Sequence, residues 1–370
     1  MNKGMGSAIE HGVCLLLIIG GAALILHPAI VSGGLPIATD QILFQAPWEE
    51  ARPEGTAVSA DPLAREQAAR FYPWYAFISD SSSRDDSLLW NPLENGGFPF
   101  LAVWRTRVFS PFTAPFYFFP VQRALQLSVF LKFLVAGLCA FYVARRLGYR
   151  PPFALGTALA FQACGHMMLW TGWPISDVVP WVPLLVLFVE HLALRRVRYW
   201  PFGATVAALM LLGGDPETVA GAFFFVAVYF CVRCFAERSG FRAAFVGMLT
   251  LAASMGVALC LTAVQVLPYA EFVSLAATRG VSDPGSGLRV GHLVLSFLPH
   301  FLGQPPSVTL EGGAPRDFRV IGLLHVGLVQ ILLLPLWFAL RRHVDPLQRQ
   351  RVESLLAAAG VCFFVALFAG

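Results

Sequence analysis

Charged side chains are scarce in this sequence. Of its 370 residues, 13% are charged and 57% are apolar, and the mean hydropathy is +0.66. An average soluble domain has about 25% charged residues. The formal net charge of +4 is too small to indicate a nucleic-acid partner. The composition therefore indicates an integral membrane protein whose main solvent is lipid.

The sequence also lacks the cysteine pattern of a disulfide-linked domain, because its cysteines fall inside apolar runs. Cys231 and Cys234 form a C-x-x-C without a second pair or a nearby histidine, which favours packing over metal binding. No Ser-His-Asp or Cys-His pattern indicates a covalent nucleophile. Asp85 and Asp86 lie in a polar run that is typical of a solvated turn. We expect neither a metal nor a cofactor.

Long apolar runs are abundant. A membrane core of about 30 Å needs about 20 helical residues, and the sequence offers about nine such segments. They cover residues 13–31, 122–144, 153–170, 175–194, 200–213, 217–235, 243–267, 320–340 and 352–369. The first run has no small-residue cleavage site, so we expect it to be retained as an anchor helix. The sequence thus predicts an all-α membrane protein with one polytopic domain over residues 1–370.

The distribution of arginine predicts the orientation of these helices. Every second connection is basic: Arg145, Arg146 and Arg150, then Arg195, Arg196 and Arg198, then Arg233, Arg238 and Arg242, then Arg341, Arg342, Arg349 and Arg351. The short turns at 171–177 and 213–217 contain no Lys or Arg. By the positive-inside rule, the N-terminus and the basic loops face the cytoplasm.

Two outer segments, residues 32–121 and 268–319, are too long to be turns, and we expect function to reside in them. Apolar stretches at 108–120 and 293–302 are too short to span, so the first and fourth outer loops are predicted to contain interfacial helices. The first loop is rich in aromatic residues, which we expect at headgroup depth. These are Trp48, Trp74, Tyr75, Trp90 and Trp104.

Polar motifs in the first outer loop mark the predicted site. Asp40 follows the first helix within a few residues, and Asp61 precedes Tyr72-Pro73-Trp74. Next comes LLWNPLENGGFPF, in which Trp90 and Asn91 precede a Gly pair and a proline that favour a tight, irregular backbone. Locally, an Asn-Pro turn with an interfacial tryptophan explains this run equally well.

In this order the motifs resemble the bacterial YfhO-like membrane proteins, which are placed in the GT-C superfamily of membrane glycosyltransferases. The resemblance rests on Asp40, Asp61 with Tyr72-Pro73-Trp74, Leu89-Trp90-Asn91-Pro92, Gly97 with Pro99, Gly214 with Pro216, and Pro268 with Glu271 and Arg279. Family members are longer than this chain, which stops at Gly370 inside an apolar run. We therefore expect a truncated sequence.

The resemblance implies a GT-C-like architecture in the bacterial cytoplasmic (inner) membrane. It also implies transfer of a sugar from a polyprenyl-phosphate donor to a lipid, glycan or protein acceptor at the outer face. Inverting transfer of this kind requires a general base for the acceptor hydroxyl and no metal. Asp40 is the first candidate base and Asp61 the second. The alternative role for either is to cap a short interfacial helix.

The donor phosphate requires positive charge near the outer leaflet, for which Arg105, Arg107, Arg279 and Lys132 are candidates. Trp90, Asn91 and Glu271 complete the predicted substrate-binding residues. Lys132 lies within an apolar run, where an ionisable group is by default functional. Its alternative is to snorkel to the outer surface. His166, Asp177, Asp215 and Glu217 are more typical of capping or interfacial positions.

Two other functions remain open. A transporter would use Lys132 and the Pro/Gly-broken segments along a path through the membrane, although no inverted repeat is visible. A non-catalytic component of cell-envelope assembly would keep the membrane fold without the reaction. Substitution of Asp40 and Asp61 distinguishes a glycosyltransferase from both alternatives.

Overall fold

A computed structural model describes residues 2–37, 39–44, 47–53, 66–94, 96–275, 337–339 and 341–368. Within these residues every regular element is a helix, and the single β-bridge joins Asn91 to Phe98. Five apolar segments of the described part are long enough to cross a membrane. The first two are Ile9–Ser32 in α1 (Asn2–Ser32) and α4 (Val121–Arg146). The third, Ile175–Ala193, runs through α7 (Ile175–Val178), η6 (Val179–Trp181) and α8 (Val182–Ala193). The last two are α10 (Pro216–Ala236) and α11 (Phe241–Leu261).

These helices match five of the nine predicted spans, and the all-helical prediction is confirmed for the described residues. The predicted span at 153–170 is instead divided into α5 (Pro151–Gln162) and α6 (Gly165–Leu169), and the span at 200–213 is α9 (Trp200–Leu211). At 1.5 Å per residue, α5 and α9 are each about 18 Å long, which is less than one crossing.

The remaining two predicted spans lie near the C-terminal end. Residues 352–369 fall largely within α15 (Pro346–Phe368), whereas 320–340 lies outside the described residues apart from 337–339. Nine crossings and a GT-C architecture therefore stay predictions.

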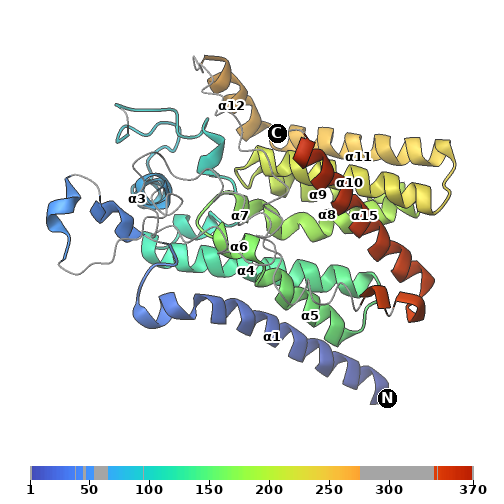
Figure 1. The fold of residues 1–370 in the computed structure, drawn as a ribbon. Coiled ribbons are helices and arrows are strands. Elements are labelled where there is room, and N and C mark those ends of the chain that lie inside the picture. Colours follow the sequence, from blue (N-terminus) through green and yellow to red (C-terminus); the bar gives the residue numbers. More distant parts are fainter. Residues whose placement is uncertain are drawn as a thin grey trace.

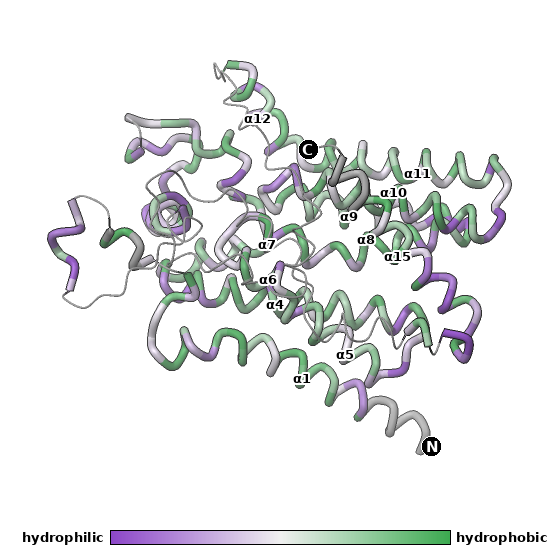
Figure 2. The backbone as a smooth tube through the Cα atoms, viewed as in Figure 1, coloured by the Kyte–Doolittle hydropathy of each residue, from purple (hydrophilic) through white to green (hydrophobic). Residues whose placement is uncertain are grey.

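The long helices lie side by side with their polar ends at the two ends of the bundle (Figures 1 and 2). The N-terminus and the basic loops share one end. There the Arg145 Nε of α4 lies 3.2 Å from His11 Nε2 of α1, and Arg351 Nη1 of α15 donates to the Leu147 carbonyl at 3.0 Å. The basic segments that contain Arg145 and Arg351 thus lie at the end of the bundle near the start of α1, and a cytoplasmic location for this end stays a prediction.

Gln162 at the end of α5 holds three helices together. Its Nε2 donates to the Phe133 carbonyl of α4 at 2.9 Å and to the Ile18 carbonyl of α1 at 3.2 Å. Gly21 and Gly137 make room for it, since a Cβ on either would lie within 3 Å of the Gln162 side chain. Small residues and interhelical hydrogen bonds of this kind are typical of helix packing in membranes.

The opposite end of the bundle is covered by the first outer loop. It contains η1 (Thr39–Phe44), η2 (Trp48–Ala51), η3 (Gln67–Phe71), α3 (Tyr72–Arg84), η4 (Trp104–Thr106) and η5 (Ala114–Tyr117). α12 (Ala263–Leu275) lies at the same end (Figure 1). The stretch 108–120, predicted to form an interfacial helix, contains η5, and its location at the membrane interface stays a prediction. The stretch predicted at 293–302 in the fourth outer loop lies outside the described residues.

The first loop has an aromatic core of its own, which the sequence did not predict. Trp74, Tyr75 and Trp104, expected at headgroup depth, are at most 7% exposed. Tyr75 stacks on Phe116, with ring centroids 4.9 Å apart, and its hydroxyl donates to the Gly172 carbonyl at 3.2 Å. Trp90 and Trp48, by contrast, are exposed. The buried aromatics fix the loop against the helix bundle, so it forms a folded layer over it.

Candidate functional site

The WNP-to-GGFP run folds into a closed loop. The backbones of Asn91 and Phe98 exchange two hydrogen bonds of 2.9 Å, and the Asn91 Oδ1 accepts from the Leu93 amide at 3.0 Å. Gly96 and Gly97 have φ of 76° and 109°, which disfavour other residues. The prediction of a shaped, irregular loop is confirmed. Asn91 is buried, and its side chain serves this loop.

Gly97 also brings Trp90 close to the backbone. A Cβ on Gly97 would lie 2.6 Å from the Trp90 Nε1, so the indole rests directly on the glycine. The indole remains 53% exposed. An aromatic ring held in place yet open to solvent provides a flat apolar surface beside polar groups.

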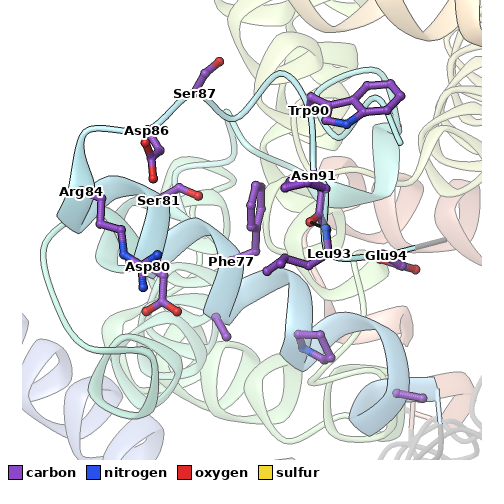
Figure 3. Close-up of a pocket in the computed structure, with 14 residues that line it drawn as sticks. Phe77, Asp80, Ser81, Arg84, Asp86, Ser87, Trp90, Asn91, Leu93 and Glu94 are labelled. Atoms are coloured by element: carbon purple, nitrogen blue, oxygen red, sulfur yellow. Dashed lines mark hydrogen bonds between the residues drawn. The ribbon is translucent and has the colours of Figure 1, made fainter. Parts of the chain in front are cut away.

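α3 lies along this loop and closes a cleft with it. Trp74 Nε1 of α3 donates to Glu94 Oε2 at 2.6 Å, and the Asp86 amide donates to the Ser81 carbonyl at 2.8 Å. Between helix and loop lies a cavity of about 780 Å³, which we call the loop cleft (Figure 3). Its lining includes Phe77, Asp80, Ser81, Arg84, Asp86, Ser87, Trp90, Asn91, Leu93 and Glu94.

The loop cleft is acidic. Three carboxylates line it, from Asp80, Asp86 and Glu94, and one guanidinium, from Arg84, which gives a net formal charge of −2. Glu94 is fixed by its hydrogen bond from Trp74. Over the part of the chain that the structure describes, neither the Asp80 nor the Asp86 carboxylate forms an ion pair, and both residues are exposed. These two carboxylates can therefore accept hydrogen bonds from a ligand.

The predicted base Asp40 lies in η1, as its second residue, rather than at the capping position before a helix. η1 packs against η2 and against η3, and η3 continues directly into α3. The backbone of Asp40 thus belongs to the layer that builds the loop cleft. Asp61, the second predicted base, lies outside the described residues. Both catalytic roles stay predictions.

Two of the four predicted phosphate-binding cations are buried around Asp177. The Lys132 Nζ of α4 lies 2.7 Å from Asp177 Oδ1, the same oxygen pairs with Arg107 Nη1, and Ser110 Oγ donates to Asp177 Oδ2 at 2.7 Å. Lys132 also donates to Ser176 Oγ at 2.9 Å. The side chains of Lys132 and Arg107 are at most 2% exposed. The snorkelling alternative for Lys132 is therefore wrong.

Arg107 is also held by its neighbours outside this pair. Its guanidinium lies 4.7 Å from the centre of the Tyr75 ring, a cation–π contact. A Cβ on Gly214, which has φ 88°, would lie 2.9 Å from the Arg107 Cβ, so glycine is required there. Burial raises the pKa of the Tyr75 phenol to about 12, and the Arg107 charge opposes that rise. Tyr75 therefore stays neutral near pH 7.

Among the described members of the predicted set, Arg105 is the cation whose side chain is partly open to solvent. Its Nη2 lies 4.0 Å from Asp215 Oδ1, and its side chain is 40% exposed. Asp215 caps α10 by accepting from the Thr218 amide at 3.1 Å, so the capping interpretation of Asp215 is confirmed. Trp104, next to Arg105, donates from Nε1 to the Leu211 carbonyl at 2.7 Å. This contact fixes the segment that carries Arg105.

Glu271 lies apart from the loop cleft. It is exposed on α12 and lines a second, mainly apolar cavity of about 550 Å³, together with Leu89 and Pro99 of the WNP-to-GGFP run. That run thus contributes to two cavities. Arg279 lies outside the described residues.

Sequence reasoning missed the importance of Asp177 and the cleft carboxylates Asp80, Asp86 and Glu94. A lysine inside an apolar helix requires a buried counter-ion, and Asp177 is an acidic residue of an outer turn without Lys or Arg. That requirement could have identified it. The cleft carboxylates carry no such signal, because their proximity depends on how α3 lies against the loop.

Comparison with family models, curated proteins and solved structures found no match to this chain.

Proposed function

We propose that this protein is a membrane glycosyltransferase that moves a sugar from a polyprenyl-phosphate donor to an acceptor at the outer face of the bacterial cytoplasmic membrane. The observation that carries the proposal is the loop cleft. Residues 90–94 of the run that most specifically resembles the family form one wall of it. α3, which forms the other wall, lies at the end of the helix bundle away from the basic loops (Figure 1).

The reaction is a single displacement at the anomeric carbon. A general base takes the proton of the acceptor hydroxyl, the acceptor oxygen forms a bond to the anomeric carbon, and the bond from that carbon to the phosphate oxygen breaks. The lipid phosphate leaves as an anion and keeps the electron pair. It needs no further activation by the protein, so no covalent nucleophile takes part.

Asp40 is the proposed base, with Asp61 the alternative. The packing of η1 against the segment that begins α3 supports Asp40, since it joins the backbone of this residue to the layer containing the cleft. Arg105 is the proposed partner of the donor phosphate, because it is the exposed cation among the described candidates. Arg107 and Lys132 then act by positioning the loop through Asp177.

The cluster of Asp177, Lys132 and Arg107 is the feature that a transporter would use. Its arrangement favours a structural role. Arg107 belongs to the first outer loop, and both carboxylate oxygens of Asp177 are occupied by loop or helix groups. We therefore propose transport only as the alternative.

The test is sugar transfer by purified protein in lipid nanodiscs, with a radiolabelled polyprenyl-phosphate sugar and membrane extract as acceptor source. Asp40→Asn is expected to abolish transfer while donor binding persists. Asp85→Asn is the matched control, because Asp85 is exposed at the end of α3 and does not line the cleft. Full activity of both Asp40→Asn and Asp61→Asn would refute the catalytic assignment. Solute uptake that depends on Lys132 without sugar transfer would identify a transporter.

A further inference from the structure

The loop cleft combines two features that the proposed transfer reaction does not itself require. One is the exposed Trp90 indole fixed on Gly97, and the other is the pair of Asp80 and Asp86 carboxylates, which form no ion pair with the residues that the structure describes. Both have consequences for which molecule fits the cleft. Figure 3 shows Asp80, Ser81 and Arg84 on α3, with Trp90 and Asn91 on the facing loop.

We propose that the loop cleft binds the acceptor, and that this acceptor is a saccharide without negative charge, either neutral or an amino sugar. The inference rests on the proposed glycosyl transfer and deepens it by naming the acceptor class. Trp90 is the stacking surface, and Asp80 and Asp86 are the hydrogen-bond acceptors.

The shape of the Trp90 site favours a sugar ring. A pyranose has an apolar C–H face and a rim of hydroxyl donors, so it matches a flat aromatic ring beside carboxylates. The Trp90 indole cannot move closer to the loop backbone, because it already lies against Gly97. The indole is therefore preorganised, and little conformational freedom is lost on binding.

The charge of the cleft decides between kinds of saccharide. A net formal charge of −2 over the lining disfavours uronic acids, phosphorylated sugars and the donor phosphate itself. It favours hydroxyl-rich neutral sugars and ammonium-bearing amino sugars. The exposed cation Arg105 does not line the cleft, so the donor phosphate has a separate position available.

The size of the cleft agrees with this assignment. A volume of about 780 Å³ lies within the usual range for ligand sites, about 300–1,000 Å³, and accommodates more than one sugar ring. Ser81 and Ser87 add hydroxyl groups to the lining.

The experiment measures equilibrium binding of three probes to the full chain in nanodiscs without donor: maltotetraose, tetraglucosamine and tetragalacturonate. We expect the first two to bind, and the third to bind at least about tenfold more weakly. Raising the salt to about 1 M, where the Debye length is about 3 Å, should weaken tetraglucosamine binding and leave maltotetraose binding unchanged.

Variants assign the contacts. Trp90→Ala should weaken maltotetraose binding by about tenfold and Trp90→Phe by less, since stacking is partly kept. Trp48→Ala is the matched control, because Trp48 is similarly exposed but lies in η2 outside the cleft. The double variant Asp80→Asn, Asp86→Asn should reduce the discrimination against tetragalacturonate, and Asp85→Asn should not.

Three results would overturn the inference: equal binding of tetragalacturonate and maltotetraose, no effect of Trp90→Ala beyond that of Trp48→Ala, or binding of tetralysine without binding of either uncharged or amino saccharide. The proposed function fails differently. Saccharide binding without consumption of any lipid-linked sugar would refute glycosyl transfer, whereas transfer that no saccharide probe inhibits would refute this inference alone.

Discussion

Lys132 of α4 and Asp177 of α7 form a buried ion pair of 2.7 Å, although 45 residues separate them and neither stands in a charged segment. Arg107 from the first outer loop pairs with the same carboxylate oxygen. Asp177 thus links the outer loop, α4 and the segment before α8. Because Lys132 and Arg107 share one carboxylate, replacing Asp177 removes the counter-ion of both cations, whereas replacing either cation removes one ion pair.

Asp177→Asn should be the most destabilising change in this cluster. It leaves the Arg107 and Lys132 charges buried without a counter-ion, and loss of one partner of a buried pair costs about 3–5 kcal/mol. Lys132→Met should cost less, since Asp177 keeps Arg107 and Ser110 as partners. Thermal unfolding in detergent measures both. An Asp177→Asn protein as stable as Lys132→Met would contradict this account.

Glu190 has a comparable role at the basic end of the bundle. It is buried and accepts from Arg233 Nε and Arg351 Nε, each at 2.8 Å, and from the Tyr229 hydroxyl. Glu190→Gln should therefore release α15, seen as faster hydrogen exchange in residues 346–362. Glu353→Gln is the control: its partners, Arg341 and Arg349, are partly exposed, and ion pairs at the surface contribute about 0–1 kcal/mol. Unchanged exchange in Glu190→Gln would refute the anchoring role.

Gly137→Ala should destabilise the junction of α1, α4 and α5. The new Cβ would lie 2.5 Å from Gln162 Nε2, and Gln162 cannot move without losing its bonds to Ile18 and Phe133. Overpacking of this kind costs about 1–3 kcal/mol. Gly156→Ala in α5 is the matched control, with nothing within 4 Å of its Cβ, and should be neutral or slightly stabilising. Equal unfolding temperatures for the two variants would contradict the packing argument.

Gly97→Ala should impair the loop cleft with little effect on the helix bundle. Its φ of 109° strains alanine, and the Cβ would displace Trp90. We expect loss of maltotetraose binding with an unfolding temperature close to that of the parent protein. Gly221→Ala, in an open position on α10, is the control. Full binding by Gly97→Ala would show that the indole position does not matter.

Topology is testable with single cysteines in a variant whose native cysteines are replaced. Ser83→Cys, exposed at the end of α3, should react with an impermeant maleimide in intact cells. Arg242→Cys, exposed at the start of α11, should react only after permeabilisation. The reverse pattern would invert the predicted orientation.

The sequence predicted the apolar helices well because their length and composition follow from the membrane itself. The spans at 122–144 and 217–235 differ from α4 and α10 by at most two residues at either end. α5 and α9 were harder to predict, because apolar residues continue past Gln162 and Leu211, where the helices end. The amino-acid composition of a segment indicates that it is buried in lipid or in protein. It does not indicate where a helix ends within that segment.

The site was predicted in outline only. Gly97 and Trp90 carry a local signal, since a Gly pair and a proline imply an irregular backbone. Asp80 and Asp86 line the same cavity as Trp90 through the docking of α3, which depends on the aromatic core around Tyr75. The Tyr75–Phe116 contact joins residues far apart in the chain, and no local pattern encodes it.

The hydrogen bonds of Gln162 also bear on how the chain is assembled during synthesis. Their acceptors, the carbonyls of Ile18 and Phe133, lie on helices that leave the ribosome before α5 does. In the predicted orientation, the first outer loop between α1 and α4 crosses the membrane before α4 is inserted. Until α5 follows, no side-chain amide joins the two earlier helices at these carbonyls. Gln162 therefore makes α5 the helix that completes the group of α1, α4 and α5.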